Sequence, residues 1–369
     1  MARRFGVSAL LLAAGLAALL LLYSPVPLAG AYRAQLWQGA TRLDRWLVHA
    51  PGTAPVPVPS RGGLPPSLVL GYYYAQPGSG AVTTLARYRH VLSGIVPFWF
   101  TIHRDGGITG RNDQQVVSYA KARHWWVFAL VQNMRGASVF GPFLADPAAQ
   151  ASARRSLERL CRRYGYDGVN LDLEGIPAAD RVAYTAFVRR LAAGLHRHGY
   201  YLTLSVPAET ADAPQNAWSG AYDYRALGRW ADLLMIMAYD QHSSDSAPGS
   251  IASRRWVERV VRYAVGVVPP AKIVLGVPAY GYDWTANGQS GAAALSYFQA
   301  AALARKYDRA HPHADHFAFY EDGVLHQVWY QNLNTFTRQV KVAVGYGLRG
   351  IVLWRLGIED PTIWQVVRH

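Results

Sequence analysis

One stretch of the chain, Tyr166–Gly175 with the sequence YDGVNLDLEG, decides how the rest of the sequence is read. Successive side chains of a β-strand point to opposite faces, so Asn170, Asp172 and Glu174 share one face and the hydrophobic residues between them share the other. A buried parallel strand is normally hydrophobic on both faces, and carboxylates on it cost several kcal/mol of desolvation unless they are paired or used. We therefore expect an active site at this strand.

The stretch belongs to a series of similar elements. Hydrophobic runs bounded by turn residues alternate with helical patterns such as Ala179–His198, which Gly199 ends. Eight such alternations predict an α/β fold, a (β/α)8 TIM barrel, whose active site lies at the carboxyl ends of the strands. The predicted strands are Ser67–Tyr74, Val91–Ile102, Trp125–Asn133, Tyr166–Glu174, Tyr201–Ala208, Leu233–Asp240, Lys272–Tyr280 and Gly350–Leu356.

Extra sequence follows the seventh predicted strand, between Trp284 and Trp329. Within it, Phe317–Tyr320 and Val324–Tyr330 predict a small hairpin. This small insertion is either a wall of a substrate groove or a decoration of the loop, and the sequence favours neither interpretation.

The N-terminus predicts export. Two arginines precede an uncharged run from Phe5 to Tyr23, and the small residues Ala29–Ala31 offer a cleavage site. We interpret residues 1–31 as a signal peptide or membrane anchor, with a slight preference for an anchor facing the cell envelope. Residues 32–66 would form a juxtamembrane or barrel-packed helix and a proline-rich spacer. Residues 67–369 would form the catalytic barrel.

The single cysteine, the net charge and the histidines limit the kinds of site and partner that the sequence predicts. Cys161 lies on the apolar side of a helix that Asp146 would cap, with Pro147 in its first turn, so we expect a buried structural thiol. The net charge of +14 comes almost wholly from arginines placed as pairs on predicted helix faces, which indicates an anionic envelope partner or biased composition and no nucleic acid. The histidines are scattered, so we expect no metal site and no cofactor.

Several motifs carry a family resemblance. Asp167–Glu174 resembles the Asp-Gly-x-x-x-Asp-x-Glu signature of glycoside hydrolase family 18, the chitinase-like enzymes. Other motifs resemble the branch of that family that contains the spore-germination and cortex-lytic N-acetylglucosaminidases, and the resemblance runs from about Leu68 to Trp364. Those motifs are residues 237–242, 248–253, 256–257, 276–284 and 350–357.

The resemblance implies roles for individual residues. Glu174 would be the proton donor, Asp172 would polarise the substrate's acetamido N–H, and Tyr239 would donate its hydroxyl to the acetamido oxygen. Asp240 would be a hydrogen-bonding neighbour and Trp354 the floor beneath the sugar. Weaker candidates for contact with the substrate, each as easily explained by packing, are Tyr73, Trp99, Gln132, Tyr280, Tyr282, Asp283 and Trp284.

Asn170 departs from the many chitinases that carry Asp at this position, although it resembles the cortex-lytic branch. Without a third carboxylate on the strand face, we expect Asp172 to stay ionised through most of the working pH range. We also expect Asn170 to contact the substrate, and Asn170→Asp to fold nearly as well as the wild type if this side chain is solvated in the cleft.

The sequence thus predicts an exported, retaining N-acetylglucosaminidase that acts on a β-linked amino-sugar polysaccharide. Peptidoglycan is the preferred substrate, and chitin or poly-N-acetylglucosamine is the alternative. The rival is a catalytically silent barrel that binds glycan as a lectin or scaffold, but such proteins usually lack the acid that Glu174 supplies here.

Overall fold

The computed structural model describes residues 64–65, 67–74, 80–133, 137–285, 291–311 and 314–367. The predicted signal or anchor and nearly all of the proline-rich spacer lie outside these residues, so the expectations for them stay predictions. Among the described helices, none combines the length and the apolar character needed to cross a bilayer.

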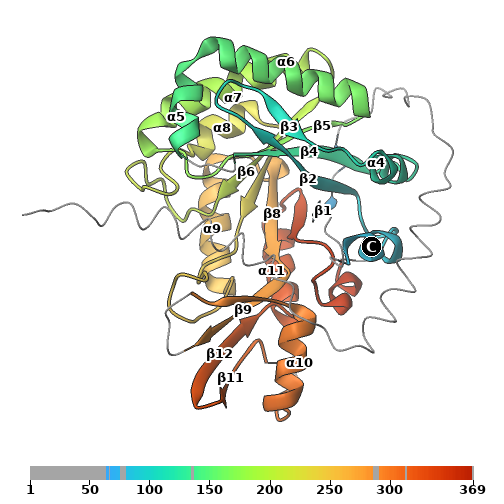
Figure 1. Cartoon of the computed structure of the whole chain (residues 1–369), viewed down its shortest axis with the longest axis vertical. Helices are drawn as coiled ribbons and strands as arrows, with labels where there is room; N and C mark the ends of the chain where they lie inside the picture. The colour runs from blue at the N-terminus through green and yellow to red at the C-terminus, as the bar shows by residue number, and fades with distance from the viewer. Residues whose placement is uncertain are drawn as a thin grey trace, which may run out of the picture.

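Eight parallel strands close into a barrel (Figure 1). The first and second barrel strands pair with each other, which closes the ring, and a short antiparallel strand, β3 (Ile108–Gly110), is added to the second. All eight predicted strands are therefore confirmed, each a little shorter than the sequence indicates. In chain order they are β1 (Leu68–Tyr73), β2 (Gly94–Ile102), β4 (Trp126–Gln132), β5 (Gly168–Asp172), β6 (Tyr201–Pro207), β7 (Leu233–Met237), β8 (Ile273–Pro278) and β13 (Gly350–Trp354).

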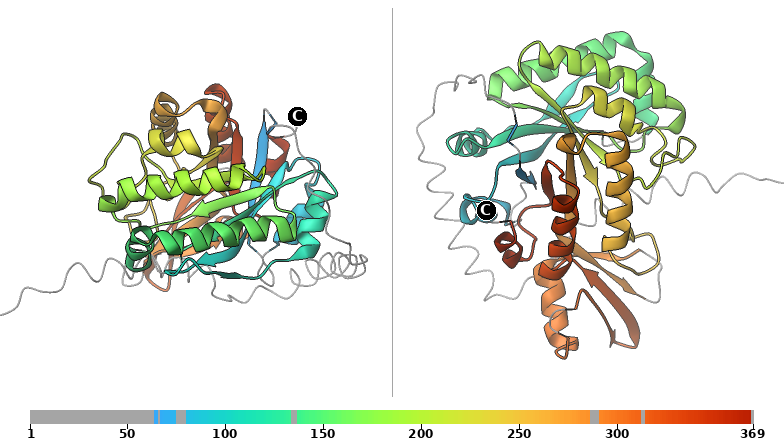
Figure 2. Two further views of the ribbon diagram at one scale, coloured as in Figure 1. Left: turned by 90° about the horizontal axis from the view of Figure 1, so that it is seen from above. Right: turned by 180° about the vertical axis from the view of Figure 1, so that it is seen from behind.

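Helices surround the barrel (Figure 2). The largest hydrophobic cluster lies between the helices and the outer faces of the strands, and a second cluster fills the barrel interior. The helices are α3 (Ala81–Arg87), α4 (Gln114–Lys121), α5 (Ala137–Ala145), α6 (Pro147–Tyr164), α7 (Arg181–His196), α8 (Tyr224–Trp230), α9 (Arg254–Val267) and α11 (Leu333–Gly345), with short 3₁₀ turns at Ala178–Asp180, Pro270–Lys272 and Pro361–Gln365.

The start and end of α6 follow from the sequence. The Asp146 carboxylate accepts hydrogen bonds from the backbone N–H groups of Ala148 and Ala149, Pro147 occupies the first turn, and Gly165 ends the helix with a φ of 77° that glycine adopts without strain. Cys161 is fully buried, as predicted.

The insertion after β8 forms a small domain of its own. Its four-stranded antiparallel sheet contains the predicted hairpin, and α10 (Tyr297–Tyr307) covers one face of the sheet. In Figures 1 and 2 it lies at the opposite end of the molecule from α5 and α6. The other face packs against residues at the mouth of the barrel, which makes the insertion part of the site's surroundings. Its strands are β9 (Tyr280–Thr285), β10 (Ala293–Ser296), β11 (His316–Glu321) and β12 (Val324–Tyr330).

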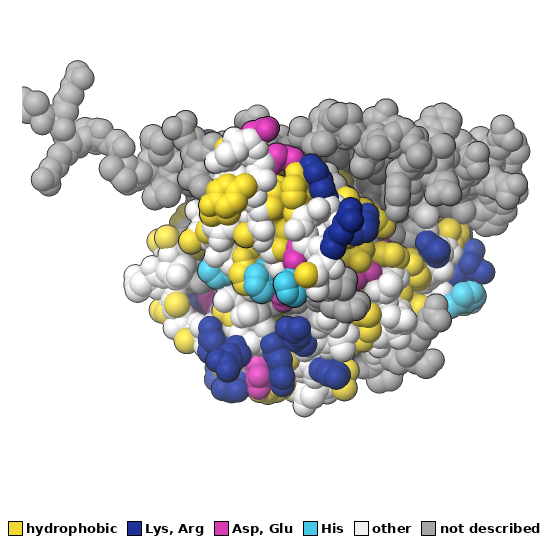
Figure 3. Space-filling view, turned by 90° about the horizontal axis from the view of Figure 1, so that it is seen from below, with side chains coloured by type: hydrophobic (Ala, Val, Ile, Leu, Met, Phe, Trp, Pro, Cys, Tyr) yellow, Lys and Arg dark blue, Asp and Glu magenta, His cyan; other side chains and the backbone are white. Residues whose placement is uncertain are grey.

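Figure 3 views the molecule from the insertion's end. Lysine and arginine side chains form separate groups on this face, with hydrophobic and histidine side chains between them. The arginine pairs predicted on helix faces lie on α6, α7 and α9, exposed except for Arg154, which is half-buried. The basic charge is thus distributed over the helical surface.

Candidate active site

Strand β5 carries the two central carboxyl groups. Asp172 is its last residue and Glu174 follows two residues later, which places their Cα atoms about 6.6 Å apart along an extended chain. Asp172 is buried, and its Oδ1 atom has no hydrogen-bond partner among the described residues. Glu174 is half-buried, so solvent reaches it although protein surrounds it on most sides. Asp172 therefore presents an unpaired hydrogen-bond acceptor next to Glu174, whose carboxyl group solvent reaches.

Asn133, just beyond the end of β4, fixes the backbone of Glu174. Its side-chain Nδ2 donates to the Glu174 carbonyl oxygen (2.7 Å), and its Oδ1 accepts from the Glu174 N–H (2.8 Å). An amide side chain that satisfies both backbone groups of one residue replaces the strand ladder, which has ended at Asp172. Asn133 thereby holds Glu174 in an orientation that the strand alone no longer provides.

A buried polar network lies beneath the carboxyl pair. Asn170 donates from Nδ2 to Thr203 (3.0 Å) and accepts at Oδ1 from Ser205 (3.0 Å), and the hydroxyls of Ser205 and Tyr72 are 2.7 Å apart. Asn170 has no exposed surface, so the expectation that it faces a solvated cleft and contacts substrate is wrong. Its amide donates and accepts at once, which a carboxylate at this position could not do.

The surroundings raise the pKa of both carboxyl groups. Burial raises the pKa of Asp172, opposed by Ser205, and burial raises the pKa of Glu174 with further contributions from the charges of Asp172 and Asp240. The two groups therefore retain a proton at higher pH than ordinary carboxyl groups, so the structure favours the ionised form of Asp172 less than the sequence-based expectation assumes. A carboxyl group that keeps its proton near neutral pH is suited to act as a general acid.

Tyr239 follows β7 and faces the same space. Burial raises its pKa well above the usual range, with contributions from Tyr72, Asp172 and Glu174, so its hydroxyl remains a hydrogen-bond donor. Gly276 makes room for its ring, because a Cβ there would lie 3.1 Å from the Tyr239 ring and 2.4 Å from the backbone oxygen of Ile236.

Asp240 turns the chain away from the barrel, with a left-handed φ of 56° that aspartate tolerates better than most residues. Its Oδ1 accepts hydrogen bonds from the hydroxyls of Tyr280 (2.5 Å) and Tyr282 (3.1 Å), which are both buried. The three residues connect the loop after β7 to the insertion sheet, so the predicted neighbour role of Asp240 has a structural basis. The hydroxyls of Tyr280 and Tyr282, which were predicted to contact substrate, are thus both bound to Asp240.

Trp354 ends the last barrel strand and stays partly exposed. The ring of Tyr72 meets it edge-on at 5.2 Å between centroids, and Phe98 does so at 6.0 Å. These contacts fix the indole at the barrel mouth beside Tyr239. A fixed, partly exposed indole is suited to stack against the apolar face of a sugar ring.

Four of the weaker candidates for contact with the substrate do not point toward the two carboxyl groups. Tyr73 and Trp99 pack against each other in the outer cluster (centroids 6.1 Å apart), because Tyr72 and Phe98 hold the inward positions of the same strands. Trp284 is buried and donates its indole N–H to the Ser246 carbonyl (2.9 Å), and Asp283 turns toward the α10 side and contacts His326 (2.8 Å). Gln132 does point inward, where its Nε2 donates to Thr101 (2.9 Å).

The site residues absent from the sequence-based prediction are Asn133, Ser205, Tyr72 and Phe98. Ser205 could have been found from the sequence, because Thr203 and Ser205 alternate with leucines on β6 as the polar residues do on β5. Nothing in the sequence marked Asn133, because a single asparagine just after a strand is common. Among the described residues, no three His, Cys, Asp or Glu side chains are placed to hold a metal ion.

The chain is similar in sequence to known glycosylases and cortex-lytic enzymes. The chain is 32% identical over 291 residues to the putative sporulation-specific glycosylase YdhD of Bacillus subtilis, covering 75% of this chain and 69% of YdhD. It is 29% identical over 290 residues to the cortical fragment-lytic enzyme of Bacillus anthracis, covering 75% of this chain and 67% of that enzyme.

Solved structures agree. A chitinase from Chromobacterium violaceum superimposes with a TM-score of 0.72 at 29% identity, covering 82% of this chain and 98% of the chitinase. The spore cortex-lytic enzyme SleL of Bacillus cereus superimposes with a TM-score of 0.73 at 26% identity, covering 82% of this chain and 73% of SleL.

One family model covers the site and seven of the eight barrel strands, from β2 to β13. The model for glycosyl hydrolases family 18 matches residues 85–359, which include both carboxyl residues of β5, Tyr239 and Trp354. The chain therefore belongs to glycosyl hydrolases family 18 and is a glycosidase.

Proposed function

We propose that this glycosidase hydrolyses β-linked N-acetylglucosamine-containing strands of peptidoglycan by a retaining, substrate-assisted mechanism. One observation carries the proposal: the Oδ1 atom of Asp172 is buried without a partner in the described chain, directly beside Glu174. A buried unpaired acceptor is costly, and the N–H of a substrate acetamido group would satisfy it.

The proposed mechanism assigns a step to each of the three central side chains, and their positions support it. Glu174 donates its proton to the leaving glycosidic oxygen while the acetamido oxygen of the substrate attacks the anomeric carbon. Asp172 accepts the acetamido N–H, which increases electron density on the acetamido oxygen, and the Tyr239 hydroxyl orients that oxygen. Water, deprotonated by Glu174, then opens the cyclic intermediate from the face that the leaving group occupied, so the configuration is retained.

The choice of substrate rests on similarity. Two relatives are named for lysis of spore cortex or its fragments, and a third, 26% identical over 258 residues, is the di-N-acetylchitobiase of Rattus norvegicus. These names support an amino-sugar glycan, and the preference for peptidoglycan comes from the cortex-lytic relatives.

The test incubates the purified full-length protein with peptidoglycan strands, chitin oligosaccharides and poly-N-acetylglucosamine. We expect mass spectrometry to show new N-acetylglucosamine reducing ends from peptidoglycan, and NMR to show the β-anomer as the first product. An α-anomer as first product, or efficient cleavage of a fully de-N-acetylated polymer, contradicts the mechanism. Cleavage of chitin alone contradicts the choice of substrate.

A further inference from the structure

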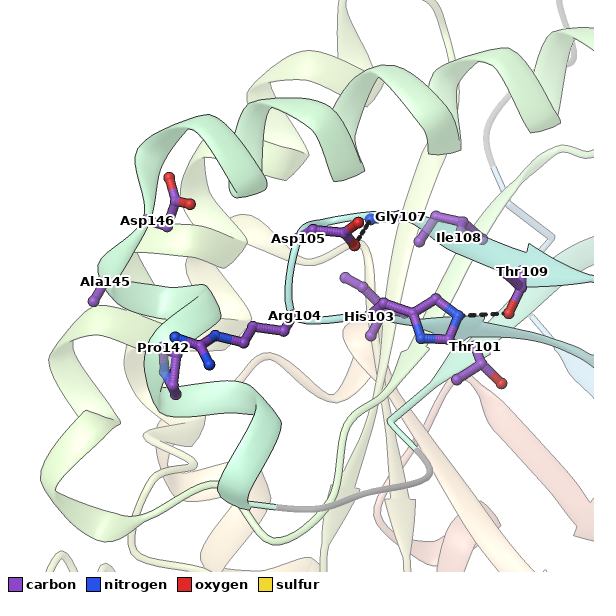
Figure 4. Close-up of a pocket in the computed structure, with 11 residues that line it drawn as sticks. Thr101, His103, Arg104, Asp105, Gly107, Ile108, Thr109, Pro142, Ala145 and Asp146 are labelled. Carbon is purple, nitrogen blue, oxygen red and sulfur yellow. Dashed lines mark hydrogen bonds between the residues drawn. The ribbon is translucent and has the colours of Figure 1, made fainter.

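A cavity of about 1130 Å³ lies beside the barrel mouth, between the β2–β3 hairpin and the end of α5 (Figure 4). The catalytic groups described above do not line it. Among the described residues, its lining consists of Thr101, Ile102, His103, Arg104, Asp105, Gly107, Ile108, Thr109, Pro142, Ala145 and Asp146.

The register of the barrel places this cavity relative to the reaction. Asp172 pairs with Gln132 on the neighbouring strand, and Gln132 pairs with Thr101 on the next. With neighbouring strands about 4.8 Å apart, Thr101 lies roughly 10 Å from the carboxyl pair at the same level of the barrel. That distance is within reach of a substituent on a sugar next to the cleaved bond.

The composition of the cavity differs from that of a sugar subsite. Sugar faces stack on flat aromatic rings, as Trp354 offers, but the described lining of this cavity contains no Trp, Tyr or Phe. It combines small apolar surfaces, such as Ile108 and Pro142, with charged groups of both signs. Such a mixture suits a peptide, which presents apolar side chains, amides and carboxylates together.

The charged groups are not equivalent. Asp105 accepts a hydrogen bond from the Gly107 N–H (2.8 Å), and Asp146 is occupied at Oδ1 in capping α6. The ring of His103 is engaged with Thr109 (2.6 Å). Arg104 is exposed, and in Figure 4 its side chain extends across the cavity from the hairpin toward Pro142. A guanidinium in this position is a ready ligand for a carboxylate.

The hairpin that presents Arg104 is fixed to the body of the protein. Its turn is closed by two backbone hydrogen bonds, between His103 and Gly107 and between Gly106 and His103, each 2.9 Å. Gly106 has a φ of 76°, and a Cβ there would lie 1.9 Å from the Ala149 carbonyl of α6. The turn thus packs directly on α6, which sets where Arg104 projects.

We propose that this cavity binds the peptide substituent carried by the glycan strand, with Arg104 binding a carboxylate of that peptide. The inference rests on the proposed action on peptidoglycan and extends it, because it makes the enzyme selective for strands that retain their peptides. The sugar chain is then held at Trp354 and the peptide at the hairpin.

The test compares two substrates prepared from one source: peptidoglycan strands with intact peptides, and the same strands after an amidase has removed the peptides. We expect Arg104→Gln to lower kcat/KM about tenfold on peptide-bearing strands, as the loss of about 1.4 kcal/mol from a charge-assisted hydrogen bond implies, and to leave kcat/KM on bare strands unchanged. Arg111→Gln, an exposed arginine outside the cavity, should change neither.

Each other outcome overturns the inference in a recognisable way. If Arg104→Gln leaves both rates unchanged, or lowers both equally, the cavity does not select peptides although the proposed function stands. If the wild-type protein cleaves neither kind of strand but cleaves chitin oligosaccharides, the proposed substrate fails and the inference fails with it.

Discussion

Carboxyl groups that burial gives a raised pKa lie both at the end of β5 and in the loop after β6, and of these two regions only the first forms a site. At β5, Asp172 and Glu174 lie together at the carboxyl end of the barrel, near Tyr239 and the exposed part of Trp354. In the loop after β6, Glu209 is 4% exposed, its oxygens make no hydrogen bond of good geometry, and burial raises its pKa to about 7.

The difference between the regions lies in what surrounds each group. The charged neighbours of Glu209 are Asp212, Arg181 and Asp223, and the guanidinium of Arg181 is itself bound to Asp212 (2.7 Å) and Asp223 (3.2 Å). No second group that could act on a substrate converges with Glu209 among these neighbours. A desolvated carboxyl group therefore indicates catalysis only when it shares a cleft with groups that complete the chemistry.

Replacing Glu174 and Glu209 by glutamine in separate variants tests this distinction most directly. Glu174→Gln should lower kcat by at least about 10²-fold, because general acid catalysis contributes that much, while glycan binding and folding persist. Glu209→Gln, the same change at a more deeply buried group, should leave kcat unchanged. The measurement is the initial rate of reducing-end release from peptidoglycan, with circular dichroism as the folding control. Equal losses in the two variants would refute the distinction.

A second substitution tests the coupling between the carboxyl groups of β5. The charge of Asp172 raises the pKa of Glu174, so Asp172→Asn should lower the pKa of Glu174 and make it lose its proton at lower pH. We expect the alkaline limb of the kcat profile to move toward acidic pH and kcat at the optimum to fall by about 10- to 100-fold.

The control for this experiment is Asp212→Asn, which removes a carboxylate near Glu209 and should leave the pH–rate profile in place. If the alkaline limb of Asp172→Asn coincides with that of the wild type, the two groups of β5 are not coupled in the working enzyme.

The next prediction concerns Asn133, a positioning residue that acts through the backbone of Glu174. Asn133→Ala leaves the N–H and the carbonyl of Glu174 without their partners, which should lower kcat about tenfold with KM nearly unchanged and cost about 1–3 kcal/mol of stability. Asn133→Asp, which keeps only the acceptor, should restore part of kcat. A rise in KM at constant kcat would indicate direct contact with substrate instead.

The polar residues of β5 could be predicted from the sequence, whereas the inward-facing residues of β1 and β2 could not. The alternation on β5 and the glutamate just after it were enough to predict that Asp172 and Glu174 lie at the carboxyl end of a barrel strand, because polar residues on a buried strand stand out against their neighbours. On β1 and β2 both faces are hydrophobic, so nothing distinguished Tyr72 from Tyr73 or Phe98 from Trp99, and an irregularity between Phe98 and Phe100 shifts the register further.

Other features were beyond the sequence for a different reason. The Asn133 contact joins two strand ends that are 41 residues apart, and the cavity at Arg104 is created by the packing of the β2–β3 turn on α6. Contacts of this kind depend on three-dimensional closure of the barrel. Periodicity and composition report what each segment buries, but they do not report which segment it meets.

The smallest expected effect is on stability and concerns Glu209. Its folded-state pKa of about 7 lies above its ordinary value of 4.5, so the folded protein binds this proton more tightly than the unfolded chain does. Stability from this group is therefore fully present below about pH 4.5 and is lost as pH rises toward about 7. The shift corresponds to about 3 kcal/mol, which partial screening near the surface reduces to about 1–2 kcal/mol.

Glu209→Gln removes the titration, so the free energy of unfolding of the variant should exceed that of the wild type by about 1 kcal/mol at pH 8, with no gain at pH 4.5. Urea unfolding of both proteins at the two pH values measures this difference. A variant that is less stable than the wild type at pH 8 would show that Glu209 is held ionised by its neighbours, and the physical likeness to the catalytic pair would then disappear.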